Sequence, residues 1–352
     1  TLREFLKFYR IEWTPLRYHK RPSLPATLYD IIIGQVKAFY LAKQMQADIV
    51  HVRSYIPALI ALPVKWFLGC KILFDIRGFW ADERVDGGVW SRDSLVYRNV
   101  KRLERYIFRA ADHVVTLTEE SVSKIIGFGY WDNIKPNITV IPTCADLEKF
   151  TLPKKIPASS PFIFGYVGSF GNSYMLRETM RLFLAILKYR PEARMIIINN
   201  KENELIRSFI TQEGLPADRI EIIKSLHKEI VSHIQRMHVA SAFYKPCFSN
   251  IARAPTKLAE YLGCGIPCVV NSGVGDTEEI LEEDGIGVIL RSFDTDEIYK
   301  AAKKIINLSY DYSIRKKCRK TALTRFSLID GVESYRSIYK NLTLPTGRER
   351  SI

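Results

Sequence analysis

Short apolar runs alternate with amphipathic stretches along nearly the whole chain. The runs in the first half lack the in-and-out alternation of a half-exposed strand, which predicts strands buried on both faces. These runs span residues 47–52, 71–76, 113–117 and 138–141. Helical spacing fills the intervals, as in 28–46 and 94–110. A second series of such runs, again separated by helical patterns, lies at 162–168, 193–199, 219–224, 239–244, 267–271 and 287–290.

This alternation predicts an α/β fold with parallel sheets, wound right-handed with helices on both faces. The segment TLPKKIPASSP (151–161) combines three prolines with two serines and has no apolar period, so we interpret it as a linker. We therefore predict two facing Rossmann-like domains, at 1–152 and 153–327. The helical pattern within 328–352 follows the second sheet and is expected to cross back to the first domain. Ligands bind beyond the carboxyl ends of such strands, so the interdomain cleft is the expected site.

The composition indicates a folded protein with an anionic partner. The 352 residues carry a formal net charge of +14 and a pI of about 9.4, which favours phosphates, a nucleic acid or an anionic bilayer surface as partner. The basic segment 98–109 is interpreted as an amphipathic helix on a sheet, with contact to anionic lipid headgroups as the alternative. No window offers the roughly 18 uninterrupted apolar residues of a membrane span. Six cysteines without a C-x-x-C pair indicate reduced thiols in a cytosolic compartment and no zinc site.

The stretch APTKLAEYLGCGIPCVVN (254–271) carries the most chemistry. Pro255 suits a first helical position, which places Thr256, Lys257 and Leu258 in a first turn whose N–H groups have no intrahelical partner. Such a turn binds anions, and Lys257 adds a positive charge. Glu260, one turn later on the same face, can accept hydrogen bonds from two sugar hydroxyls. A surface ion pair between Lys257 and Glu260 is the alternative interpretation.

Two glycine-containing loops follow strands of the second series. YVGSFGN, which contains Gly168 and Ser169, ends the first strand of that series. NSGVGDTEEI follows the strand after the 256–263 helix, with Asp276 or Thr277 as the expected helix cap. Either loop alone could be an ordinary turn. Together with the anion-binding turn, in one sheet, they predict a site for a nucleotide diphosphate.

The chain resembles the retaining glycosyltransferases of family four, which have the GT-B fold of two facing Rossmann-like domains. The resemblance covers nearly the whole chain and includes HVVTLTEES, VIPTCADLEKF (140–150) and YVGS. Its most specific part is PTKLAEYLGCGIPCVVN followed by GVGDTEEI, where family members carry a similar EAMACGxPVV run.

The resemblance implies roles for particular residues. Glu260 would hold the nucleotide ribose, and the backbone amides of Thr256, Lys257 and Leu258 would meet the diphosphate. The sheet ends of the first domain would face the acceptor, through His51, Arg53, Asp75 and Arg77. The alternative for these four residues is a structural role, as a strand end, a surface charge and a loop-holding ion pair between Asp75 and Arg77.

Several positions depart from the family pattern. The first of two family glutamates, which touches the donor sugar, is replaced by Ala252. The phosphate-binding arginine is replaced by Ser169, and the lysine a few residues later falls near Ser173 or Tyr174. Arg77 stands where the family has a histidine. We expect Lys257, Arg253 and Lys245 to supply the missing positive charge, with catalysis resting on Lys257, Arg253 and Arg77. The family's first strand–helix–strand unit has no counterpart before residue 11, so we expect it to be missing from this sequence.

The sequence therefore predicts transfer of a sugar from a nucleotide-diphosphate donor to an acceptor hydroxyl, with retention at the anomeric carbon. The resemblance implies no metal requirement, so no cofactor is expected. A glycan or lipid-linked acceptor at the cytoplasmic face of a membrane is expected, and no nucleic acid. The alternatives are a GT-B sugar-nucleotide epimerase and a non-catalytic nucleotide-sugar or polyanion binder. A nicotinamide dehydrogenase is disfavoured because no G-x-G-x-x-G follows a strand.

Overall fold

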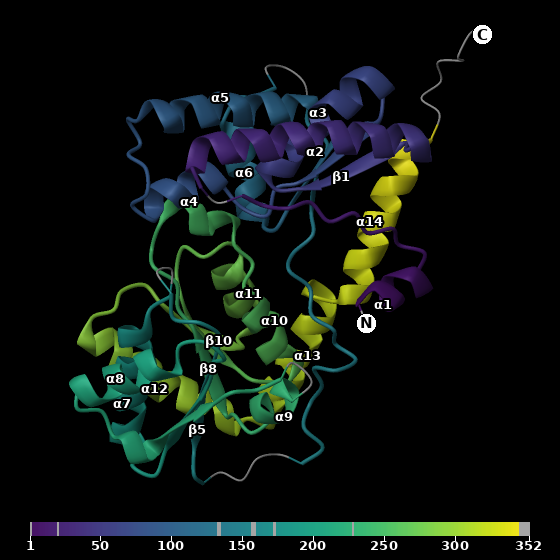
Figure 1. Ribbon diagram of the computed structural model, residues 1–352. Helices are drawn as coiled ribbons and strands as arrows, with labels where there is room; N and C mark the ends of the chain where they lie inside the picture. Colours follow the sequence, from purple (N-terminus) through teal and green to yellow (C-terminus); the bar gives the residue numbers. More distant parts are fainter. Residues whose placement is uncertain are drawn as a thin grey trace.

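The computed structural model describes residues 2–19, 21–131, 135–155, 160–171, 174–226 and 229–344. The chain forms two α/β domains, one above the other in the view of Figure 1. The strand order is β1-β2-β3-β4 in the first sheet and β10-β9-β8-β5-β6-β7 in the second, and neighbouring strands pair in parallel. The predicted α/β fold with two parallel sheets is confirmed.

The N-terminal domain is built on the first sheet, and its strands lie where the uninterrupted apolar runs predict them. The strands are β1 (Ile49–Arg53), β2 (Lys71–Asp75), β3 (His113–Thr116) and β4 (Ile138–Val140). The helices are α1 (Leu2–Phe8), α2 (Ser23–Met45), α3 (Tyr55–Leu68), α4 (Trp80–Asp86), α5 (Leu95–Ala110) and α6 (Glu119–Gly127). Ile107 and Phe108 of α5 pack against Ile72 and Phe74 of β2, so this basic helix covers the sheet as its spacing predicts.

The C-terminal domain is built on the second sheet, with helices on both of its faces. The strands are β5 (Ile163–Val167), β6 (Arg194–Ile198), β7 (Ile220–Ile223), β8 (Val239–Ala242), β9 (Cys268–Asn271) and β10 (Gly287–Leu290). The helices are α7 (Leu176–Tyr189), α8 (Asn203–Gln212), η1 (Ala217–Arg219), α9 (Ile230–Ile234), η2 (Phe248–Ala252), α10 (Thr256–Gly263), α11 (Thr277–Asp284) and α12 (Thr295–Tyr310). Across the described parts of both domains, no helix has the length and apolar content needed to cross a bilayer.

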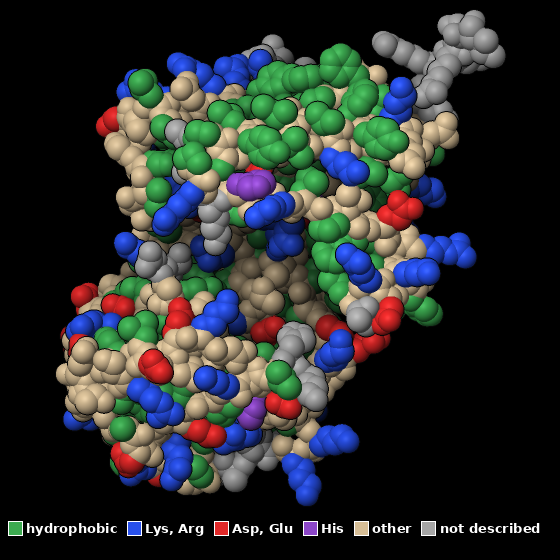
Figure 2. All heavy atoms as spheres, in the orientation of Figure 1, with side chains coloured by type: hydrophobic (Ala, Val, Ile, Leu, Met, Phe, Trp, Pro, Cys, Tyr) green, Lys and Arg blue, Asp and Glu red, His purple; other side chains and the backbone are tan. Residues whose placement is uncertain are grey.

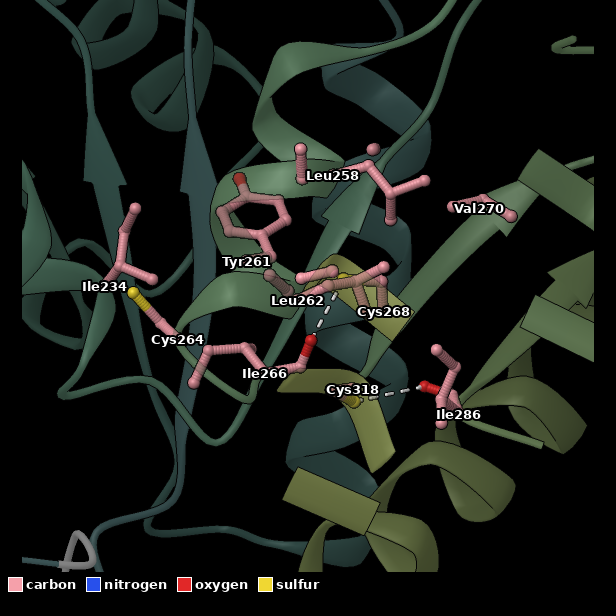
Figure 3. Packing of buried hydrophobic residues seen from close by; sticks show 14 of the residues in the cluster. Ile234, Leu258, Tyr261, Leu262, Cys264, Ile266, Cys268, Val270, Ile286 and Cys318 are labelled. Atoms are coloured by element: carbon pink, nitrogen blue, oxygen red, sulfur yellow. Dashed lines mark hydrogen bonds between the residues drawn. The ribbon is translucent and has the colours of Figure 1, made fainter. Parts of the chain in front are cut away.

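Helix α10 is anchored by its apolar side in the core beneath the second sheet. Leu258, Tyr261 and Leu262 point into this core and are fully buried (Figure 3). The Tyr261 hydroxyl accepts a hydrogen bond from the backbone N–H of Val167 at 2.7 Å, which ties α10 to the end of β5. Cys318 also lies in this core as a free thiol. Because these apolar contacts fix α10, its polar face has a defined position at the edge of the sheet.

The chain passes from the first core to the second earlier than the boundary predicted at residue 152. Ile141 packs in the N-terminal domain, whereas Ala145, Leu147 and Phe150 already belong to the C-terminal core. The predicted linker contains the prolines, but these apolar positions before it decide where packing begins. Residues 151–155 have no regular structure, and 156–159 lie outside the described residues.

The chain returns to the N-terminal domain through its last two helices. Helix α13 (Tyr312–Arg325) packs in the C-terminal domain, and α14 (Leu328–Thr343) runs up beside the first sheet (Figure 1). Ile338 of α14 packs with Leu73 and Val115 of β2 and β3. The rest of the predicted terminal segment, 345–352, lies outside the described residues.

The two domains also meet on the other side of the cleft. The rings of Phe79 and Phe248 stack with centroids 5.6 Å apart, where η2 lies against α4. The Thr118 hydroxyl donates a hydrogen bond to the Ile251 carbonyl at 2.7 Å. These contacts hold η2, and the residues that follow it, close to the N-terminal domain.

Asp276 links the domains in a way that the sequence does not predict. Its carboxylate accepts hydrogen bonds from the backbone N–H groups of Glu119 (2.8 Å) and Glu120 (3.0 Å), at the start of α6. Asp276 precedes α11 but makes no side-chain cap to it. Asp276 therefore caps α6 of the N-terminal domain and not α11, because the first N–H groups of α6 have no intrahelical partner and favour an anion.

Candidate functional site

The strand order of the second sheet reverses between β5 and β8. From β5 the chain winds outward through β6 and β7, whereas β8, β9 and β10 lie on the other side. A crevice forms beyond the carboxyl ends of the two strands at such a reversal, and ligands bind there. Gly168 and Ser169 follow β5, Tyr244 and Lys245 follow β8, and the first turn of α10 adds Lys257 at the same place. The predicted diphosphate residues are therefore brought together.

Lys257 lies inside a cage of three tyrosines. Its side chain is 7% exposed, and Nζ donates a hydrogen bond to the Tyr166 hydroxyl at 3.0 Å. Nζ also lies 4.2, 4.5 and 5.5 Å from the ring centroids of Tyr166, Tyr174 and Tyr244. Aromatic faces attract a cation, and desolvation strengthens that attraction. The cage holds the ammonium group at the end of the glycine loop.

Lys257 is buried and Glu260 is half-buried, and their charges affect each other although the structure records no ion pair between them among the described residues. Burial lowers the pKa of Lys257 to about 7, and the Glu260 carboxylate opposes this shift. Burial raises the pKa of Glu260 to about 7, and Lys257 opposes that shift in turn. Both charged forms are poorly solvated, so a ligand that pairs with either charge is favoured.

At Gly168 the backbone passes close to the Lys257 side chain. Its φ is +124°, and a Cβ atom at this position would lie 3.1 Å from Lys257 Nζ. The loop is fixed from the next strand, because Asn199 donates a hydrogen bond to the Gly168 carbonyl at 2.9 Å. The Ser169 carbonyl accepts a hydrogen bond from the Tyr166 hydroxyl at 2.8 Å. Ser173, the expected position of a family lysine, lies outside the described residues, whereas Tyr174 belongs to the cage.

Arg253 stands between two cavities of the interdomain cleft. The two cavities have volumes of about 260 and 540 Å³, and Arg253 lines both. Its guanidinium is held in place because Nε donates to Asn250 Oδ1 at 2.7 Å and the group lies 5.0 Å from the Tyr244 ring centroid. Lys245, exposed on the rim, lines the larger cavity. Figure 2 shows the hollow between the domains, with Lys and Arg side chains at its upper rim.

The predicted acceptor-side residues His51 and Asp75 also come together, beneath α14. The Nε2 atom of His51 lies 4.0 Å from Asp75 Oδ2, and the same oxygen accepts a hydrogen bond from the Tyr335 hydroxyl at 3.0 Å. His51 Nδ1 and the Tyr339 hydroxyl are hydrogen-bonded at 2.7 Å. Desolvation lowers the pKa of His51, against the effect of Asp75. Arg53 pairs with Asp75 in the strand register and is exposed.

Arg77 follows β2 in a strained backbone conformation. Its φ is +58°, which is unusual for a side chain of this size, and Gly78 follows with φ +149°. Asp75 contacts His51 and Tyr335, so the alternative of an Asp75–Arg77 ion pair is not the arrangement seen among the described residues. Strained residues of this kind concentrate at functional sites, and Arg77 lies at the carboxyl end of a strand of the first sheet.

Ala252 faces the N-terminal domain instead of an open cavity. It is 1% exposed and packs in the cluster that contains Phe79, Phe248 and Ile251. A side chain at this position therefore belongs to the interdomain contact, which explains why a small apolar residue fits here. The sequence also gives no sign of the tyrosine cage, although Tyr166 and Tyr244 do stand at the ends of predicted strands.

Two α/β domains facing each other across a cleft, with an anion-favouring crevice in the second, have the architecture of the GT-B fold. The chain belongs to the family described as glycosyl transferases group 1, which matches residues 148–325. Residues 4–149 match the family described as Glycosyltransferase Family 4. The chain is thus a glycosyltransferase, and the resemblance found in its sequence is confirmed.

Solved structures with this fold include sucrose-phosphate synthase from Thermosynechococcus elongatus. It is 14% identical with a TM-score of 0.71, over 94% of this chain and 81% of that one. Anabaena HepE, solved with UDP, is also 14% identical with a TM-score of 0.71, over 96% and 89% of the chains. A glycosyltransferase from Rickettsia africae is 17% identical with a TM-score of 0.70, over 98% and 89%. Among curated proteins, none matches the chain.

Proposed function

We propose that this glycosyltransferase uses a nucleotide-diphosphate sugar as its donor. The observation that carries the proposal is the meeting of the glycine loop at Gly168, the first turn of α10 and the two cations Lys257 and Arg253 at one strand reversal. Backbone N–H groups and cations at such a point bind phosphates. HepE, which shares the fold, has been solved with UDP and with UDP-glucose.

The transfer breaks the bond between the anomeric carbon and the phosphate oxygen and forms a bond from that carbon to the acceptor oxygen. Negative charge develops on the leaving diphosphate, and Lys257, Arg253 and the α10 amides stabilise it. The acceptor oxygen attacks from the face that the phosphate leaves, and its proton passes to the leaving phosphate, so the configuration is retained without a protein nucleophile. These cations take the role of a metal, and we propose that no metal is required.

Glu260 is proposed to hold the nucleotide ribose. An ionised carboxylate accepts two hydrogen bonds, which suits the adjacent hydroxyls of a ribose. The half-buried side chain with a pKa of about 7 gains a partner when the nucleotide binds. Glu260 and Lys257 then contact neighbouring parts of one ligand.

The acceptor is proposed to be a glycan or lipid-linked sugar, bound by the N-terminal domain at the cytoplasmic face of a membrane. Arg77 and the pair His51–Asp75 are the proposed acceptor-side groups. The net charge of +14 supports an anionic surface as partner. Exposed aromatic side chains of α1 and the segment after it, including Phe5, Phe8 and Trp13, add apolar contact area, and Figure 2 shows apolar side chains over much of this domain's face.

A donor screen followed by a transfer assay tests this proposal. UDP-, GDP-, ADP- and CDP-sugars are first compared by thermal shift, and the best donor is then incubated with glycan and lipid-linked acceptors. We expect a glycosylated product whose anomeric configuration by NMR equals that of the donor, and equal rates with and without EDTA. Conversion of the donor in the absence of acceptor into another sugar nucleotide would indicate the epimerase. Binding without transfer or hydrolysis would indicate the non-catalytic binder.

A further inference from the structure

The larger interdomain cavity is lined by charges of opposite sign from the two domains. The C-terminal domain contributes Lys245 and Arg253, and the N-terminal domain contributes Glu83 and Asp86 from α4 together with Arg84. The volume of about 540 Å³ is sufficient for a hexose. The cavity adjoins Arg253, which the proposed function places on the diphosphate. A sugar attached to that diphosphate would therefore reach this space.

The Glu83 side chain lines this cavity and lies beside the loop that follows β2. A Cβ atom at Gly78 would lie 2.6 Å from Glu83 Oε1, so the carboxylate sits directly against the backbone of this loop. Protein on both sides of the cleft raises the pKa of Glu83 by desolvation, and the charge of Arg253 lowers it. The described residues give the Glu83 carboxylate no hydrogen bond, and the side chain is exposed toward the cleft. It is thus available to a ligand.

The other acids near the cavity are already engaged. Asp86 Oδ2 accepts a hydrogen bond from the Ser249 backbone N–H at 2.8 Å, which helps to fix η2 against α4. Asp82 on the same helix is buried and bonds Tyr97 and Lys101 on the far side. Among the described cavity-lining side chains of the C-terminal domain none is acidic. Glu83 is therefore the carboxylate that can serve a sugar.

We propose that Glu83 recognises the transferred sugar, by accepting hydrogen bonds from its hydroxyl groups across the cleft. The inference rests on the proposed function, because the diphosphate at Arg253 and Lys257 brings the sugar to the cavity. A carboxylate that accepts from two adjacent hydroxyls favours a neutral hexose over a sugar that carries its own carboxylate, because like charges repel. The C-terminal domain then binds the nucleotide, and the N-terminal domain supplies the contact that selects the sugar.

The experiment compares nucleotide and nucleotide-sugar affinities by titration calorimetry. UDP with UDP-glucose and GDP with GDP-mannose are the probes, and the pair that binds wild type more tightly is used. In Glu83→Gln we expect the sugar nucleotide to bind about tenfold more weakly, since a charged hydrogen bond is lost, while the free nucleoside diphosphate keeps its affinity within about twofold. Glu83→Ala repeats the test without the amide. Glu221→Gln, exposed on β7 where it pairs with Arg236, is the matched control and is expected to change neither affinity.

The outcomes separate this inference from the proposed function. If wild type binds none of UDP, GDP, ADP and CDP, the proposed donor class is wrong, and the inference falls with it. If wild type binds both ligands and the two Glu83 variants do so equally well, the donor class stands and the role of Glu83 is overturned. An equal loss for the free diphosphate and the sugar nucleotide also overturns it, because it shows an effect on the domain contact. A melting temperature unchanged from wild type shows that the variants are folded.

Discussion

Because Lys257 is buried in the tyrosine cage, we expect the free energy of unfolding to depend on pH. A single substitution of Lys257 should remove this dependence. The pKa of Lys257 is about 7 in the folded protein and about 10.5 when the side chain is solvated, so the unfolded state binds more protons between these values. The free energy of unfolding therefore rises with pH across that window, by about 1.4 kcal/mol per pH unit. Lys257→Met keeps the apolar stem and abolishes this slope.

Glu260 must be replaced if the contribution of Lys257 to the pH dependence is to be measured alone. Glu260 raises the pKa of Lys257, and its own pKa near 7 gives a titration of opposite sign below that pH. The comparison is therefore made in a Glu260→Gln background, where the pKa of Lys257 falls further. Between pH 7.5 and 9.0, Glu260→Gln should gain about 2 kcal/mol of unfolding free energy relative to Lys257→Met/Glu260→Gln.

Urea unfolding followed by tryptophan fluorescence at pH 6.0, 7.5 and 9.0 measures the two profiles. Lys303→Met in the same background is the control, because Lys303 is exposed on α12, and it should leave the slope unchanged. If the free energies of unfolding of Glu260→Gln and Lys257→Met/Glu260→Gln change in parallel over the three pH values, Lys257 is not desolvated in the folded protein. A lysine that swings out of the cage into water would give that result.

Three further predictions concern binding and domain contact. Glu260→Ala should weaken nucleoside-diphosphate binding and activity at least tenfold, and wild-type turnover would reject the ribose assignment. At pH 8, binding of the nucleoside diphosphate selected by the donor screen should take up close to one proton, because Lys257 is mostly neutral before a diphosphate raises its pKa. The heats measured by calorimetry in Tris and in HEPES should therefore differ, and equal heats would contradict this prediction. Asp276→Ala should lower the unfolding free energy by about 1 kcal/mol, as loss of a helix cap does, while Asp276→Asn should lower it less; no change in urea midpoint would exclude the interdomain cap.

The strands could be predicted from the sequence because parallel strands buried on both faces leave uninterrupted apolar runs. The run at 71–76 matches β2, whose residues are almost all buried. Helix ends are harder to predict from the sequence than strands. The spacing predicts a helix from Leu28, whereas α2 begins at Ser23. Pro25 lies in the first turn of α2, where its missing N–H costs no intrahelical hydrogen bond, so it does not stop the helix.

Some residues of the candidate site could likewise be predicted from the sequence, and others could not. Gly168, Lys257 and Glu260 are predicted because a strand end and a helix start are local patterns with a known position in an α/β sheet. The cage depends on Tyr166, Tyr174 and Lys257 meeting in space, which no spacing along the chain encodes. The burial of Ala252 could not be predicted without the position of the N-terminal domain, because the contact of η2 with α4 is what buries its side chain.

The residues that break local rules gather at the cleft, and this is the strongest physical reason to place function there. Lys257 is an ionisable side chain in a cage where burial opposes its charge, and Arg77 has a positive φ without being glycine. Gly168 also has a positive φ, next to Lys257. Each lies at or just beyond the carboxyl end of a strand, and neither sheet needs them for its core. In the proposed function, a diphosphate beside Lys257 pairs with the ammonium form that burial disfavours, so the pKa of Lys257 rises when the donor binds.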